Sequence, residues 1–400
     1  FRFLSSYTAF RIMQRICAVT GGPFETSAAE VEYCRANDVP LPVLSFPERL
    51  RQMLVFRNRP YLYHSTCAYS GKPILSCVPP ERGLSVYDVE LWQSDVWDAR
   101  NYAQNYNFQQ PFFQQFGRLF SRVPYPNLAV VLPTMENSFY TNGITSAKNC
   151  YLVFSSSFTE DCMFSYALWH SRCLVDCVFA KQCELCFDCV NITDCYNLRF
   201  SEHCQNCTDS AFLFQCYGCA NCWLCTNLSH RSYCFENEQL SKTQYEKKIQ
   251  EIDLGSRIAV NAQKRRFRKI SAAAPIKVYY GAENLNSSGN HIRNTRNCRN
   301  CFFVTNSEDL TDCIYLDRAK SSIAHAHFGT DTELIYNSVT AGDSVYNLRF
   351  CAECWQGSRD LEYCILCCYG CSHCFGCTGL RKASYCILNR QYTKDEYFAL

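Results

Sequence analysis

The spacing of the cysteines constrains this chain more than any other feature. Between Cys150 and Cys234 a cysteine falls every few residues, most often as C-x-x-C, with short β-forming runs between them. The stretch then recurs, because the five residues Tyr-Asn-Leu-Arg-Phe at 196–200 return unchanged at 346–350. Self-similarity of this kind predicts a fold built from stacked repeats.

The rhythm of the cysteines predicts the shape of each repeat. Cysteines recur near positions 150, 162, 173, 186, 195, 207, 219 and 234, and a short apolar strand followed by Asn, Asp, Ser or Gly fills each interval. Short, evenly spaced strands are typical of a β-solenoid, in which each coil stacks on the previous one. The sequence therefore predicts a mainly β fold with two tandem cysteine-rich, β-solenoid-like repeats.

Composition and helix signals divide the chain into five parts. We expect a mixed α/β N-terminal module at 1–135, a first repeat at 136–240, a helical linker at 241–282, a second repeat at 283–389 and the start of a terminal helix at 390–400. Capping boxes at Ser241-x-x-Gln244 and Thr393-x-x-Glu396 predict two helix starts. Since the chain begins with Phe1 and stops at Leu400 inside an expected helix, we expect further sequence on both sides.

Two motifs of the N-terminal module look like degenerate zinc knuckles. Cys17-Ala-Val-Thr-Gly and Cys67-Ala-Tyr-Ser-Gly match C-x-x-C-G, except that a hydroxyl residue replaces the second cysteine. A structural zinc site needs four nitrogen or sulfur ligands. We interpret both motifs as hairpins without metal.

Two amphipathic helices are expected in the same module. One begins at Pro47, with Leu50, Leu54 and Val55 on its apolar face, and the other begins at Pro111. The second carries a wide apolar face that we interpret as core or interface: Phe112, Phe113, Phe116, Leu119, Phe120 and Val123.

Stacked strands would bring equivalent cysteines within bridging reach. Neighbouring strands lie ~4.8 Å apart, and disulfide Cα–Cα distances are ~4.4–6.8 Å. The sequence thus predicts a ladder of disulfides or a stack of buried thiols. An odd count, 31, leaves at least one thiol unpaired within the chain. The expected ladder comprises Cys150, Cys162, Cys173, Cys177, Cys186, Cys195, Cys207, Cys219, Cys222, Cys234, Cys301, Cys313, Cys354, Cys371, Cys374 and Cys386.

Metal binding is the alternative use of these cysteines. Zinc is the alternative cofactor, and its best ligand sets are Cys183, Cys186 and Cys189 in the first repeat and Cys371, Cys374 and Cys377 in the second. The second repeat, however, has Ala324, Ala326 and Gly329 where cysteines are expected. Because these cysteines are missing from the second repeat, a metal cluster is not required in every repeat. We therefore expect no cofactor.

Asparagines accompany many of the cysteines. Asn149, Asn197, Asn206 and Asn221 are examples. Asn tolerates the left-handed conformation that a coil corner demands, and stacked amides can bond to their copies above and below. We therefore expect these residues at corners.

Candidates for catalysis are few. The acidic pairs Glu160-Asp161 and Glu308-Asp309 could be nominated for glycoside cleavage, but they read as turn acids. His325 and His327 alternate, which places them on one side of an ordinary strand, and we expect them on the exterior. No nucleophile elbow, P-loop or dinucleotide fingerprint is present, so we predict a protein that is not an enzyme.

Charge and hydropathy bound the partners. The net charge of +2 favours neither nucleic acid nor an anionic surface, although 264–269 is a basic run on an expected helix. No apolar run approaches the ~18–20 residues of a membrane span. A second copy of the chain is the expected partner, through a homo-oligomer or filament.

Several further motifs are specific when taken together: Phe56-Arg57-Asn58 with Tyr63 and Ser70-Gly71, Trp92-x-Ser94-Asp95-x-Trp97-Asp98, Pro111-Phe112-Phe113-x-Gln115-Phe116, Glu136-Asn137-Ser138, Gly376-Cys377-x-Gly379-Leu380 and Tyr385–Asn389. At these residues the chain resembles a protein family of candidate-phyla-radiation (Patescibacteria) bacteria, in which zinc-ribbon-like knuckles precede tandem cysteine-rich repeats. The family pattern has cysteines at Thr20, Ser45 and Glu48. The resemblance implies architecture and a bacterial source, and no catalytic residue.

These observations favour a structural protein. We expect a solenoid stabilised by disulfides or thiols that self-assembles into an extracellular fibre or surface layer, with a cytoplasmic location as the alternative. The alternative function is a zinc-binding module that contacts nucleic acid or protein.

Overall fold

The chain folds into two compact units, each drawn from separate parts of the sequence. A computed structural model describes residues 13–57 and 60–400. One unit comprises 60–95 and 125–277, and the other comprises 13–57, 96–124 and 278–400. The N-terminal module expected at 1–135 is therefore not one body, because its middle part packs with the first cysteine-rich repeat and its other parts pack with the second. Residues 1–12 and Asn58 lie outside the described residues.

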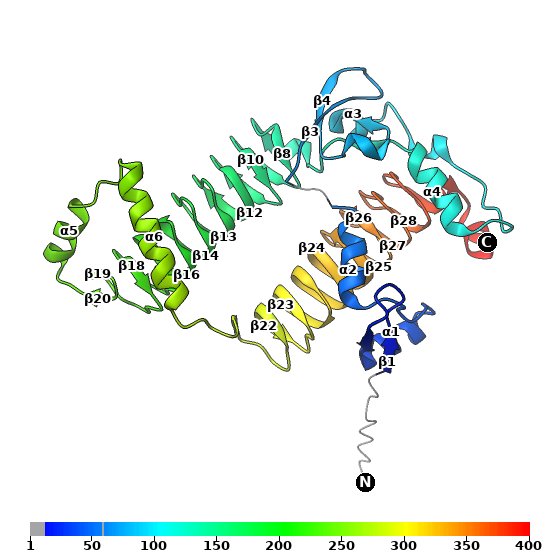
Figure 1. Ribbon diagram of the computed structural model, residues 1–400. Helices are drawn as coiled ribbons and strands as arrows, with labels where there is room; N and C mark the ends of the chain where they lie inside the picture. Colours follow the sequence, from blue (N-terminus) through cyan, green and yellow to red (C-terminus); the bar gives the residue numbers. More distant parts are fainter. Residues whose placement is uncertain (1–12, 58–59) are drawn as a thin grey trace, which may run out of the picture. The chain divides into compact units, whose positions relative to one another are not determined.

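The unit at 60–95 and 125–277 holds the first cysteine-rich repeat (Figure 1). A hairpin and short elements precede the repeat: β3 (Tyr63–Thr66), β4 (Pro73–Ser76), η1 (Pro80–Arg82), β5 (Val86–Tyr87), α3 (Val89–Gln93), β6 (Tyr125–Pro126) and η3 (Leu132–Thr134). The first ladder follows: β7 (Met135–Glu136), β8 (Tyr140–Asn142), β9 (Thr145–Lys148), β10 (Tyr151–Phe154), β11 (Ser157–Glu160), β12 (Met163–Arg172), β13 (Val178–Lys181), β14 (Val190–Thr193), β15 (Tyr196–Arg199), β16 (Glu202–Gln205), β17 (Thr208–Phe214), β18 (Trp223–Thr226), β19 (Cys234–Phe235) and β20 (Glu238–Gln239). Two helices end the unit, α5 (Lys242–Gln250) and α6 (Arg257–Ala273).

The other unit holds the second repeat. Its N-terminal elements are β1 (Met13–Ile16), β2 (Pro23–Thr26), α1 (Ala28–Ala36), α2 (Phe46–Leu54), η2 (Ala99–Tyr102) and α4 (Phe112–Arg122). The second ladder comprises β21 (Gly281–Ala282), β22 (Gly289–Arg296), β23 (Cys301–Thr311), β24 (Ile314–Gly342), β25 (Tyr346–Arg349), β26 (Ala352–Trp355), β27 (Arg359–Glu362), β28 (Ser372–Phe375), β29 (Ser384–Ile387) and β30 (Arg390–Gln391), and α7 (Lys394–Ala399) follows it. The fold is thus mainly β, as the sequence predicts.

Both ladders are parallel and keep a nearly constant register. In the first ladder Val178 pairs with Val190 and Val190 with Glu202, so each strand meets the segment twelve residues further on. The second ladder begins with an eleven-residue step, from Gly281 to Ile292, and continues with twelve-residue steps. Its middle widens to thirteen residues, as in the pairing of Leu348 with Leu361. We call each twelve- or thirteen-residue segment a rung.

A left-handed residue at every third position shapes each rung. Asn149, Leu152, Ser155, Phe158 and Asp161 all have φ between 51° and 55°. The residue after each of them is buried: Cys150, Val153, Ser156, Thr159 and Cys162. Each left-handed residue turns the chain, so twelve residues provide four corners and four inward side chains. The side-chain period is therefore three, rather than the two of an ordinary strand.

Small inward side chains follow from this narrow core, and polar ones are hydrogen-bonded within it. Ser165 shows the pattern, since its Oγ donates to the Met163 carbonyl (2.8 Å) and accepts from the Cys177 N–H one rung later (3.0 Å). A buried hydroxyl without partners would be costly. Here the serine hydroxyl provides a hydrogen-bond partner for a backbone carbonyl of its own rung and for a backbone N–H of the next rung.

The C-terminal edges of both ladders are closed by the same device. Asn389 Oδ1 accepts from the Thr378 N–H (2.9 Å) and its Nδ2 donates to the Thr378 carbonyl (2.8 Å). Asn237 treats Thr226 in the same way, at 2.8 Å and 3.2 Å. An antiparallel strand and a helix follow each cap, and the capping boxes of α5 and α7 are confirmed. Exposed edges invite the addition of another strand, and these side chains occupy them.

Helices cover one side of the second ladder. The aromatic face of α4 packs there, with Phe112 4.9 Å from Phe375 and 5.2 Å from Tyr363 between ring centroids. The interpretation of this face as core or interface is confirmed for Leu119 and Val123, which are buried, whereas Phe113 is 67% exposed. The helix expected from Pro47 is confirmed as α2. The face predicted for it is wrong, because Arg49 and Met53 are buried while Leu54 and Val55 are exposed.

The burial of Arg49 has an electrostatic reason. Its Nη1 lies 2.7 Å from Glu30 Oε1 of α1, and its Nη2 lies 3.6 Å from Asp312 Oδ2 of the second ladder. Burial raises the pKa of both carboxyl groups, and the guanidinium opposes that rise. A buried cation between two acids therefore joins α1, α2 and the ladder.

No helix in the part of the chain that the structure describes is both long and apolar enough to cross a lipid bilayer.

Candidate functional site

The inward face of the ladders is the main concentration of reactive groups. All the cysteines expected in the ladder lie at inward, buried positions except Cys173, which has φ 55° and is half-buried on the outside. That exception follows from the three-residue period, because Cys173 is one residue out of phase with Cys150 and Cys162. The same period places further buried cysteines inside that the nine-to-fifteen spacing missed: Cys183, Cys189, Cys204, Cys216, Cys225, Cys298, Cys351, Cys364, Cys367 and Cys377. The C-x-x-C spacing was the signal that could have identified them.

The thiols are hydrogen-bonded in a repeating manner. Cys177 Sγ lies 3.4 Å from the Val175 carbonyl and 3.6 Å from the Cys186 carbonyl. Cys189 does the same with Phe187 (3.3 Å) and Leu198 (3.4 Å). Each S–H thus donates to the carbonyl two residues before it or to the one nine residues after it. Cysteine suits this core because it combines the volume of a small hydrophobe with a weak donor.

None of the 31 cysteines, all of which lie in the described ranges, is in a disulfide. Of the two alternatives, the ladder of disulfides is therefore absent. In-register parallel rungs hold equivalent Cβ atoms about one strand spacing apart, ~4.8 Å, whereas a disulfide needs ~3.5–4.5 Å. The Cα–Cα criterion alone was too permissive.

Neighbouring thiols affect each other's ionisation. Burial raises the pKa of five thiols well above the ordinary value: Cys189, Cys351, Cys367, Cys368 and Cys377. Along a column one thiol donates and the next accepts, so the contact with Cys195 raises the pKa of Cys207. The partner that accepts is affected in the opposite direction, because hydrogen bonds from Cys183 and Cys207 lower the pKa of Cys195 to about 4. Since the thiolate is the nucleophile and the metal ligand, burial is what keeps these sulfurs away from solvent.

The alternative metal ligands are not assembled into a site. Cys183, Cys186 and Cys189 occupy three consecutive sides of one rung, and Cys371, Cys374 and Cys377 follow the same spacing. Within the described ranges no group of three or more His, Cys, Asp or Glu side chains could hold a metal ion.

The expected asparagine corners are confirmed. Asn149, Asn197, Asn206 and Asn221 all have positive φ. Asn149 Nδ2 donates to Asp161 Oδ1 (3.0 Å), and Asn197 Nδ2 donates to Asp209 Oδ1 (2.8 Å), each one rung away. The amide groups therefore form ladders on the outer surface.

The acids nominated for catalysis make structural contacts. Glu160 pairs with Lys148 (3.5 Å), and Asp161 accepts from Asn149. Glu308 lies between Arg296 and Lys320, and Asp309 accepts from Asn297 (3.0 Å). Each acid therefore bonds to a basic or amide side chain at the equivalent position of a neighbouring rung.

The two histidines do not share a face. His325 points into the core with 0% exposure, and neither ring nitrogen has a hydrogen-bond partner. Burial lowers the pKa of His325 to about 4. His327 is partly exposed and packs on Tyr315, at 5.1 Å between ring centroids. The expectation that both lie outside is wrong for His325, because the side-chain period is three.

The two knuckles share one geometry. The Ala18 N–H donates to Val43 and the Ala68 N–H to Val86, which places each knuckle against the start of a helix. Ser45 Oγ donates to Cys17 Sγ (3.7 Å), and the Asp88 N–H donates to Cys67 Sγ (3.3 Å). A hydrogen bond from Thr20, and then one from Ser45, lowers the pKa of Cys17 to about 6. Hydrogen bonds therefore surround the sulfurs that remain.

A run of in-register residues on the outer face of the first ladder is partly covered by α6. We call it the outer column, and each member pairs in parallel with the next: Tyr140, Tyr151, Met163, Val175, Phe187, Arg199, Ala211, Trp223 and Phe235. Lys264 of α6 lies 2.5 Å from Asp188 and 4.6 Å from the Phe200 ring centroid. Arg266 pairs with Glu236. Two basic side chains of α6 thus form ion pairs with acidic residues of the same unit.

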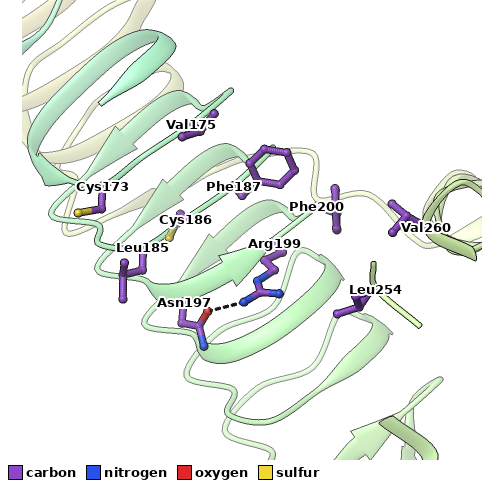
Figure 2. A pocket seen from close by; sticks show the side chains of 10 residues that line it. All are labelled: Cys173, Val175, Leu185, Cys186, Phe187, Asn197, Arg199, Phe200, Leu254 and Val260. Carbon is purple, nitrogen blue, oxygen red and sulfur yellow. Dashed lines mark hydrogen bonds between the residues drawn. The ribbon is translucent and has the colours of Figure 1, made fainter. Parts of the chain in front are cut away.

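Where the cover of α6 ends, a hollow opens (Figure 2). The ladder contributes Val175, Phe187 and Phe200, and Leu254 and Val260 come from the segment around α6. Arg199 lies beside Asn197 at its rim, where Nη2 donates to Asn197 Oδ1 (3.5 Å). The hollow therefore extends the apolar contact between helix and ladder.

Comparisons with known proteins assign no family. No family model and no curated protein matches the chain. One solved structure is described as that of an acetyltransferase from Desulfovibrio desulfuricans G20, an activity that its description gives as unproven. It shares 10% identity, with 64% of this chain and 69% of that chain covered and a TM-score of 0.13. A likeness this weak carries no argument, and the resemblance to a Patescibacteria family stays a prediction.

Proposed function

We propose that this chain is a non-enzymatic structural protein, a β-solenoid scaffold with a core of reduced thiols that associates with further copies or partners. The carrying observation is that buried side chains fill the inward positions of the rungs and that most of their polar atoms bond to the backbone of the same ladder, with His325 as an exception. Such a core leaves reactive groups sealed. The outer faces are then the surfaces available for function.

The mode of association is lateral in this proposal. Asn237, Asn389 and the antiparallel strands after them occupy the C-terminal edges, so strand addition has no open template there. Of the two ladders expected for an extracellular fibre or surface layer, disulfides or thiols, the disulfide ladder is absent. Free thiols favour the cytoplasmic alternative, because reducing compartments preserve them.

Alkylation of the native protein under anaerobic conditions tests the sealed core. We expect iodoacetamide to modify only Cys77 and Cys173, which are half-buried, and to modify all 31 cysteines after denaturation. Metal analysis of the same material is expected to give less than one zinc per chain. Extensive native alkylation, bridges between rungs or several bound zinc ions would contradict the proposal.

A further inference from the structure

Helices dock on the same outer column in both ladders. Arg199 and Arg349 occupy equivalent places in the repeated Tyr-Asn-Leu-Arg-Phe motif. The equivalent column of the second ladder is the one that contains Arg349. Its in-register members are Tyr336, Arg349, Glu362, Phe375 and Ile387. The two columns can therefore be compared position by position, each within its own unit.

In the second ladder the column is covered. Tyr33 of α1 stacks on Tyr336 at 5.0 Å, and Phe112 of α4 packs on Phe375 at 4.9 Å. Tyr336 retains only 2% exposure. The corner residues beside the column include Asp312, which the buried Arg49 of α2 contacts.

In the first ladder α6 repeats this arrangement over the C-terminal half of the column. Phe267 packs on Phe212 at 5.9 Å, and Trp223, at 4% exposure, points its indole nitrogen toward Gln263 Oε1 (3.4 Å). Lys264 contacts Asp188 at a corner beside the column. In both ladders, then, apolar residues of a helix cover the column while a basic residue meets a corner aspartate.

The N-terminal half of the same column is open. Tyr140, Tyr151, Met163 and Phe187 of the column, and Phe164 at the corner beside it, are 39–49% exposed. Three of their rings are in contact, with Tyr151 5.3 Å from Tyr140 and 5.7 Å from Phe164 between ring centroids. Large exposed apolar patches mark interaction sites. This one adjoins the interface with α6 at the hollow of Figure 2.

One acid stands beside the open half. Asp176 is an exposed corner residue one rung before Asp188, and the described part of the chain shows no ion pair or hydrogen bond to its side chain. Asp188 and Asp312, at related corners, each meet a basic residue of a helix. Asp176 is thus placed to meet a third.

We propose that the open half of the outer column binds an amphipathic helix of a partner protein, with its apolar side on Tyr151, Met163 and Phe187 and a Lys or Arg over Asp176. The proposal rests on the scaffold function above and names its partner class. From Tyr140 to Phe187 the column makes four steps of ~4.8 Å, or about 19 Å. A helix of about 13 residues spans that length at ~1.5 Å per residue.

A peptide of residues 256–274, which carries the whole of α6, is the probe. Labelled with a fluorophore and titrated with the full chain at low salt, it is expected to bind one site in an anisotropy assay. Asp176→Asn in the chain, or Lys264→Glu in the peptide, is expected to weaken binding by about two- to fivefold at low salt. Asp176→Lys combined with the Lys264→Glu peptide is expected to restore it. Asp194→Asn, an exposed corner acid on another side of the rung, is the control and should change nothing.

Several results would overturn the docking site. If the affinity of the peptide for the chain is unchanged by Asp176→Asn but falls with Asp188→Asn, the peptide only displaces α6 from its own site. Self-association of the chain that Asp176→Asn abolishes would make a second copy the occupant. Absence of binding, together with a core still sealed to alkylation, would reject the docking site and leave the scaffold proposal standing.

Discussion

At the scale of residues, the corners of the rungs set the fold. A left-handed residue at every third position costs most side chains roughly 1–2 kcal/mol, and Asn and Asp are the least strained of the non-glycine residues. Many corners nevertheless carry Leu, Phe or His. Stacking of these side chains between rungs compensates, as in the contact of Phe200 with Phe212 at 4.8 Å.

Replacing a corner asparagine should measure this balance. Asn197→Ala loses the side-chain bond to Asp209 and the tolerance of left-handed backbone. We expect a loss of about 1–2 kcal/mol in the free energy of unfolding, measured by urea denaturation. Thr193→Ala, at an extended position of the same ladder, should cost less than about 0.5 kcal/mol. Equal effects of the two changes would contradict the role of the corner.

His325 should make the second ladder sensitive to acid. Its pKa is near 4 in the folded protein, against 6.5 ordinarily, so the unfolded chain binds the proton more readily. The associated stability is fully present above pH 6.5 and is lost as the pH falls toward 4, by about 3 kcal/mol in total.

The test compares two histidine variants. His325→Leu is expected to flatten the decline of stability between pH 7 and pH 4.5, measured by thermal melts across that range. His327→Leu, two residues away and facing outward, should retain the decline. An unchanged pH profile in His325→Leu would show that other groups cause it.

At the scale of elements, part of the architecture could be read from the sequence. The cysteine rhythm, the duplicated motif and the capping boxes of α5 and α7 predicted where strands and helices lie. The period of three could not be found from strand rules, which assume alternation, and this error misplaced Cys173 and His325. The covering of ladders by N-terminal helices was also missed, because Arg49 looks like a surface residue until Glu30 and Asp312 are brought to it by the fold.

Arg49 provides the sharpest test of that packing. Arg49→Leu leaves Glu30 and Asp312 buried without their cation, and breaking such a pair typically costs about 3–5 kcal/mol. We expect a loss of that size in the free energy of unfolding of the second-ladder unit. Hydrogen exchange of the backbone amides in α1 and α2 would measure it. Arg51→Ala, on the same helix with an exposed side chain, should cost less than about 0.5 kcal/mol. A small effect of Arg49→Leu would mean that apolar contacts alone hold the helices.

At the scale of the whole molecule, thiol chemistry separates the structural possibilities. Because in-register rungs keep equivalent Cβ atoms ~4.8 Å apart, beyond the ~3.5–4.5 Å of an unstrained disulfide, we expect a mild oxidant such as diamide to leave the native chain without bridges between rungs. Mass spectrometry of non-reduced digests would check this. A chain that acquires many such bridges while remaining folded would contradict the spacing.

The closed ends of the ladders have a consequence for how such chains can vary. Each rung bonds only to the one before and the one after it, and the closing asparagines need only a last rung to hold. Duplication of 183–194, for instance, should lengthen the protein by about 4.8 Å and leave every other contact of that ladder intact. The length of such a protein can then change during evolution in fixed increments of one rung, while the cap at its C-terminal end stays the same.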